Sequence, residues 1–181
     1  LFRSMLRPQK SEYPASIYTT RYIESVEHEN VMEALSAQMQ VVINLFANLS
    51  EAQANHRYAP EKWSLKQLLG HITDTERIFA YRALSIARGE QQSLLGFDEN
   101  EYMEASNFEE QSVSILIEQY QYNRLSSVAL FNTFSEEVLN RKGIANGNSL
   151  TVRAILWMVA GHEAHHLNII RERYLPGLNI S

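Results

Sequence analysis

The sequence has 181 residues, of which 45% are hydrophobic and 20% are charged, and it carries a formal net charge of −5 with a pI near 5.7. We expect a chain of this length to form one domain, residues 1–181, with a sizeable core. The acidic balance argues against a general nucleic-acid binder, and no apolar run is long enough to span a bilayer. The sequence has no cysteine, which excludes disulfides and thiolate ligands and favours a cytoplasmic protein.

The first part of the chain, residues 1–29, is mixed in character and contains two prolines. We predict an extended lead-in with a helical turn near Thr20–Ser25, which lays its tyrosines on the outside of the body. The start lacks the apolar core of a signal peptide. Leu1–Ser4 open without a methionine, and we assign them no function.

Four long segments with apolar residues at helical spacing make up most of the rest of the chain. They are predicted at about 31–53, 65–88, 113–134 and 150–174. Each begins near a residue that can cap a helix, namely Asn30, Ser64, Ser112 and Ser149. With only 7 glycines and 4 prolines in the whole chain, the pattern predicts an all-α protein, a four-helix bundle.

The connection between the second and third predicted helices, residues 90–111, is acidic and aperiodic. A connection of this length is unusual in a compact domain and is often functional. It must also be long if it crosses the bundle from end to end. Asn146-Gly147-Asn148 predicts a turn before the last helix.

Three of the six histidines, His162, His165 and His166, lie in one five-residue stretch inside the last predicted helix. His162 and His166 are spaced i, i+4, so they share one helix face and can bind one metal ion. His71 lies on the predicted buried face of the second helix. A bundle can therefore bring His71 together with the pair in its core.

Three neutral imidazoles suit Zn²⁺ or Ni²⁺ and leave a coordination position open for a water or a substrate thiolate. Asp74 and Thr75, one turn beyond His71, could fix an imidazole tautomer by hydrogen bonding. His165 flanks the pair, which favours a place at the rim of a pocket. Arg82 lies on the row of His71 and could bind a substrate carboxylate, although a structural ion pair is an equal alternative.

The histidines also have a simpler interpretation, as polar core residues without a metal. In that case each buried imidazole would need a hydrogen-bond partner.

Two motifs carry a resemblance to a known family. Trp63–Arg77, with the sequence WSLKQLLGHITDTER, resembles the second-helix motif of the DinB/YfiT-like superfamily, and Gly161–His166 resembles its fourth-helix motif. The similarity covers nearly the whole chain. It implies an up-down-down-up four-helix bundle, a homodimer, and a divalent metal, usually Zn²⁺ or Ni²⁺. The metal ligands would correspond to His71, His162 and His166.

Two hypotheses about function follow from the motifs and the resemblance. The superfamily includes bacillithiol S-transferase, mycothiol-dependent maleylpyruvate isomerase and many members labelled as metal-dependent hydrolases. The first hypothesis is a metal-dependent enzyme that uses a low-molecular-weight thiol or a water against a small-molecule substrate. The alternative is a non-catalytic, stress-related metal-binding or interaction module, in which the ion only joins the second and fourth helices.

Overall fold

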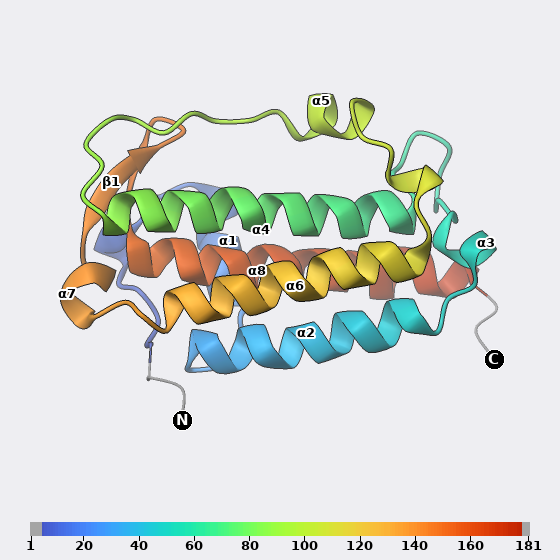
Figure 1. Ribbon diagram of the computed structural model, residues 1–181, viewed down its shortest axis with the longest axis horizontal. Helices are drawn as coiled ribbons and strands as arrows, with labels where there is room; N and C mark the ends of the chain where they lie inside the picture. The colour runs from blue at the N-terminus through green and yellow to red at the C-terminus, as the bar shows by residue number, and fades with distance from the viewer. Residues whose placement is uncertain (1–4, 179–181) are drawn as a thin grey trace.

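Four long helices form the body of the protein in the computed structural model, which describes residues 5–178. α2 and α8 run in one direction and α4 and α6 run in the other, so the order is up-down-down-up (Figure 1). The all-α four-helix bundle expected from the sequence is confirmed. The bounds are α2 (Val31–Ala47), α4 (Leu65–Ala87), α6 (Val113–Phe131) and α8 (Val152–Ile169).

Shorter helices lie between and beside the long ones. Residues 31–53 were expected to form one helix, but α2 ends at Ala47 and the separate helix α3 follows. Leu1–Ser4 lie outside the described residues. The short α-helices are α1 (Ile17–Ser25), α3 (Glu51–Ala54), α5 (Glu99–Glu104) and α7 (Glu136–Leu139). The remaining turns are η1 (Lys10–Glu12), η2 (Phe108–Glu110), the π-helical η3 (Ile170–Tyr174) that continues α8, and η4 (Leu175–Gly177).

A β-hairpin that the all-α prediction did not include precedes α8. Its strands are β1 (Lys142–Ala145) and β2 (Asn148–Thr151), and they pair antiparallel. The expected turn is present, with Asn146 at φ 49° and Gly147 at φ 72°, as a two-residue hairpin turn requires. Because Ser149 is taken up in β2, the cap of α8 is Thr151, whose side chain accepts from the backbone of Ala154.

The lead-in is more ordered than the sequence suggested. The predicted turn is the full helix α1, capped by Ser16, and it packs against α8. The two helices meet at Gly161, where an added Cβ would overlap with the backbone carbonyl of Tyr22. The absence of a side chain at Gly161 therefore allows α1 to lie directly on the face of α8 that carries His162.

The long connection crosses the bundle above α4 and is fixed at both ends (Figure 1). The backbone N–H of Leu94 donates to Ile144 and its carbonyl accepts from Asn146, both at 2.9 Å, which ties the connection to the hairpin. At the other end, the ring of Phe108 packs where a Cβ of Gly70 would lie. The connection is thus held over the helix that carries His71.

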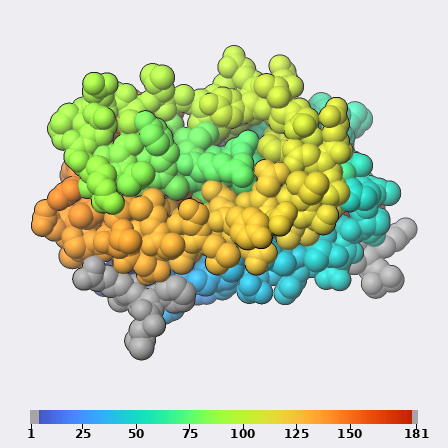
Figure 2. All heavy atoms as spheres, in the orientation of Figure 1, coloured from blue at the N-terminus to red at the C-terminus, as the bar shows by residue number. Residues whose placement is uncertain are grey.

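α8 is the most enclosed of the four long helices. It lies behind α4 and α6 in Figure 1, and none of its red colour is visible on the face shown in Figure 2. Trp157 is fully buried, and its Nε1 donates to the carbonyl of Leu6 at 3.0 Å. None of the described helices is both long enough and apolar enough to cross a membrane.

Candidate metal centre

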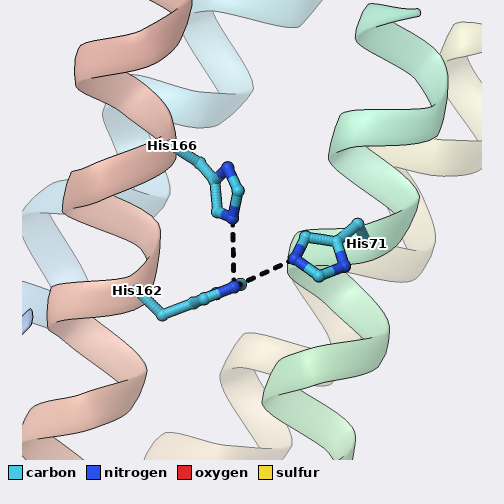
Figure 3. Close-up of side chains that lie close together, drawn as sticks. All are labelled: His71, His162 and His166. Carbon is cyan, nitrogen blue, oxygen red and sulfur yellow. Dashed lines mark hydrogen bonds between the residues drawn. The ribbon is translucent and has the colours of Figure 1, made fainter. Parts of the chain in front are cut away.

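The structure brings together the three histidines that the sequence analysis selected. The Nε2 atoms of His71 and His166 lie 3.0 and 3.1 Å from Nε2 of His162, and the three rings point toward one another from α4 and α8 (Figure 3). All three ligand atoms lie within 4.8 Å of one another. The side chains are deeply enclosed, since no residue of the triad is more than 9% exposed.

Hydrogen bonds do not satisfy these three nitrogen atoms. The Nε2 of a neutral imidazole carries either a hydrogen or a lone pair, so His162 cannot donate to one neighbour while it accepts from the other. The buried Nδ1 of His166 has no hydrogen-bond partner in the described part of the chain. Three converging nitrogen atoms suit a cation, because tetrahedral ligands at 2.0–2.1 Å from Zn²⁺ are roughly 3.3 Å apart. The residues present therefore fit a divalent metal.

Burial keeps the imidazoles in the neutral form that binds metals. It lowers the pKa of His71 from 6.5 to about 4. Burial lowers the pKa of both His162 and His166 well below the usual value, and the neighbouring histidines of the cluster lower them further. At neutral pH each of the three imidazoles is therefore uncharged and keeps one nitrogen lone pair for a metal.

Aromatic side chains pack around the triad. Tyr22 of α1 meets His162 edge to face, with ring centroids 5.6 Å apart. Trp63 lies 4.8 Å from His71 by the same measure, and Phe79 lies 6.2 Å from His162. The sequence predicts that the tyrosines of the lead-in lie on the outside. Tyr22 instead forms part of the wall, because α1 crosses α8 at Gly161.

A cavity of about 570 Å³ opens beside the triad and is lined by α1, α4, the long connection, the hairpin and α8. Its volume lies within the range of small-molecule sites. Glu99 of α5 lines it, and its Oε2 lies 3.8 Å from Nε2 of His71. Burial, and to a lesser extent Asp98, raise the pKa of Glu99. Sequence reasoning missed this carboxylate, because residues 90–111 have no periodicity that would place it.

The other residues singled out from the sequence lie in different places. Thr75 and Arg82 line the cavity. Asp74 accepts from Arg77 at 2.8 Å and is not among the cavity residues. His165 packs its ring 5.5 Å from Tyr22, also outside the cavity lining, and burial lowers its pKa.

A second buried polar cluster lies close to the triad and was also missed. Arg124 of α6 donates to both carboxylate oxygens of Glu76, at 2.8 to 3.0 Å, and to Glu163 at 2.7 Å. Its Nη1 also donates to the carbonyl of Leu35, and Tyr120 donates to Glu163 at 2.8 Å. Because Glu163 directly follows His162 along α8, this cluster fixes the rotation of α8 that turns His162 toward α4.

Comparison with solved structures shows the same fold elsewhere. YfiT from Bacillus subtilis, described as a probable metal-dependent hydrolase with an unusual four-helix bundle topology, matches with a TM-score of 0.69 at 17% identity. The match covers 94% of this chain and 92% of that one. A mycothiol-dependent maleylpyruvate isomerase matches with a TM-score of 0.62 at 13% identity, over 84% of this chain and 62% of that one.

The family of the chain is assigned from its sequence and not from the solved structures. No curated protein sequence matches this chain. The family model of the DinB superfamily, however, matches residues 34–170, a span that contains all three histidines and all four long helices except the first residues of α2. The chain therefore belongs to the DinB superfamily.

Proposed function

We propose that this protein is a divalent-metal-dependent enzyme that joins a low-molecular-weight thiol to a small electrophile, with Zn²⁺ or Ni²⁺ held by His71, His162 and His166. The observation that carries the proposal is the convergence of the Nε2 atoms of three neutral imidazoles, of which His71 and His162 line a cavity. A divalent cation would lower the pKa of a thiol or water that reaches it and so supply a nucleophile at neutral pH. The mycothiol dependence of one structural neighbour supports the thiol.

The residues around the triad have definable parts in such a reaction. Tyr22, Trp63 and Phe79 exclude water and thereby strengthen the electrostatic interactions inside the site. Glu99 places Oε2 next to the triad, where it accepts the proton that the incoming thiol or water releases.

Hydrolysis is the second candidate, because the same site would activate water. The description of YfiT supports it. A non-catalytic module is disfavoured by the cavity, since an ion that only joined α4 and α8 would need no space beside it. That alternative predicts a large loss of thermal stability on chelation and no turnover of any substrate.

The test is an assay of metal-loaded protein against a panel of cellular thiols and electrophiles. We expect electrophile consumption that requires both the thiol and the metal, and its loss in His166→Ala. Consumption without thiol would point to hydrolysis. Full activity in a His166→Ala protein that has lost its metal would contradict both reactions.

The role of Glu99 has its own test. Glu99→Gln should lower the rate by about a hundredfold or more, as removal of a proton acceptor does, with an unchanged metal content. Glu101→Gln, at an exposed position of the same helix α5, is the matched control. An unchanged rate, or loss of the metal, would overturn the proton-acceptor role.

The family resemblance also predicts a homodimer, which light scattering of the purified protein would test.

A further inference from the structure

The cavity beside the triad extends along α4 well beyond the histidines. His71, Thr75, Phe79 and Arg82 follow one another along this helix and all line the cavity. His71 stands at one end of this row and Arg82 at the other. A ligand that fills the cavity therefore meets the proposed metal site at one end and a guanidinium group at the other.

Arg82 is the buried arginine without a carboxylate partner among residues 5–178. It is 7% exposed, and its Nη2 donates to the carbonyl of Leu95 at 2.7 Å. The buried Arg124 binds Glu76 and Glu163, and the buried Arg153 binds Glu12 and Glu136. Buried charges in proteins are normally paired.

Besides its hydrogen bond to Leu95, Arg82 contacts aromatic rings. Its Cζ lies 5.7 Å from the ring centroid of Phe79 and 5.9 Å from that of Phe97, so aromatic rings flank the guanidinium. The hydroxyl of Thr75, which is 3% exposed, has no hydrogen-bond partner in the described part of the chain. Two buried polar groups on one cavity wall thus have unused hydrogen-bonding capacity.

The distance between the two ends sets the length of the ligand. The ring of Phe79 lies 6.2 Å from that of His162 and 5.7 Å from Cζ of Arg82. These two lengths together place the guanidinium at most about 12 Å from the ring of His162. Asp98 and Glu99 line the same cavity, so a single negative charge is tolerated there better than the double charge of a phosphate monoester.

We propose that Arg82 binds a carboxylate of the substrate, while the reacting group of the same molecule lies at the triad up to about 12 Å away. The position of the substrate's reacting group rests on the proposed function. The position of its carboxylate rests on Arg82 alone. The substrate class is an elongated organic acid with one carboxylate at the end opposite to its reacting group. A thiol that carries such a carboxylate fits both ends.

Calorimetric titration of the metal-loaded protein with two matched probes tests the inference. The probes are ω-mercaptooctanoate and ω-mercaptooctanol, which differ in the terminal acid. A charge-assisted hydrogen bond contributes about 1.5–3 kcal/mol, so we expect the acid to bind between about tenfold and a hundredfold more tightly. Inorganic phosphate should not displace it.

Three variants assign the preference to a residue. Arg82→Met should abolish the preference for the acid and leave the affinity for the alcohol unchanged, whereas Arg82→Lys should keep part of it. Arg77→Met, at an exposed position of α4, should keep all of it. Lysine retains the charge, so Arg82→Lys tests the inference even if the methionine variant does not fold.

The outcomes separate the inference from the proposed function. Equal binding of both probes to the wild type, an undiminished preference in Arg82→Met, or stronger binding of phosphate would overturn the inference while leaving metal-dependent activity intact. If thiol-dependent activity is absent, the heat of binding still compares the acid with the alcohol. A preference that depends on Arg82 would then support the carboxylate site on its own.

Discussion

The Arg124 cluster and the histidine triad are both buried among the long helices, but their polar atoms are satisfied in different ways. In the first cluster the guanidinium of Arg124 uses its donors on Glu76, Glu163 and the carbonyl of Leu35. In the triad, three Nε2 atoms face one another and compete for the same hydrogen bonds. In the Arg124 cluster, groups of the protein itself pair the charges. The three nitrogen atoms of the triad have no such common partner within the protein, and a bound cation would supply one.

This difference sets the structural Arg124 cluster apart from the proposed metal site. Glu163 and His162 are neighbours in α8, so the position of one cluster is coupled to that of the other through this helix. The ion pairs of Arg124 hold α4, α6 and α8 in fixed relative positions. These positions orient the three histidine side chains toward one another. The two clusters should therefore respond differently to substitution, to metal and to pH.

The largest effect is expected from removing the guanidinium group of the Arg124 cluster. Arg124→Met leaves two buried carboxylates without a counter-charge and should lower the free energy of unfolding by about 3–5 kcal/mol. Chemical denaturation measures this. The control is Lys62→Met, whose ion pair with Glu61 is exposed and should matter by less than about 1 kcal/mol. Similar losses in both variants would show that the cluster is not a stabilising element.

Substitutions in the histidine triad should change the affinity for a metal ion. His166→Ala removes a proposed ligand and should weaken Zn²⁺ binding by more than about a hundredfold, since even the loss of groups that only orient ligands costs ten- to a hundredfold. Competition with a chromophoric chelator measures this. His165→Ala should bind Zn²⁺ like the wild type. Equal weakening in both variants would contradict the assignment of ligands.

A smaller effect is expected from acid on the metal-free protein. Burial holds the pKa of His71 at about 4, below its value of 6.5 in an unfolded chain, so the unfolded state binds more protons between these two values. Stability is therefore fully present above about pH 6.5 and declines as the pH falls toward 4. His71 alone should contribute a loss of about 2 kcal/mol by about pH 5.

Denaturation curves at several pH values measure this decline. A variant in which all three histidines of the triad are glutamine should lose most of the slope, and His28→Gln, at an exposed position, should keep it. A flat profile in the wild type would contradict the burial argument.

The sequence was sufficient to predict the helices of the bundle because their signals are local. Ser64 and Ser112 cap α4 and α6 as expected, and Gly89 has the positive φ of a helix stop, +89°. The hairpin was missed because its strands are only four residues long and the second runs directly into α8. Only the Thr20–Ser25 turn of α1 was predicted and not its full length, because α1 packs against α8 at Gly161 through a contact that is distant in the sequence.

The three histidines could be selected from spacing and helix faces, but not their surroundings. The i, i+4 pair and the apolar face around His71 are visible in the sequence. Glu99 lies in an aperiodic connection, and its position depends on how that connection is anchored to the hairpin and to Gly70. Arg124 is a charged residue whose partners lie on three other helices, so no local pattern marks it as buried.

Elemental analysis of wild-type protein purified without a polyhistidine tag tests the metal site most directly. The structure predicts one equivalent of a divalent metal per chain, lost together with the His71, His162 and His166 side chains and unaffected by replacing His165. A wild-type protein that contains no divalent metal, and whose unfolding is unchanged by added Zn²⁺ or Ni²⁺, would contradict the account.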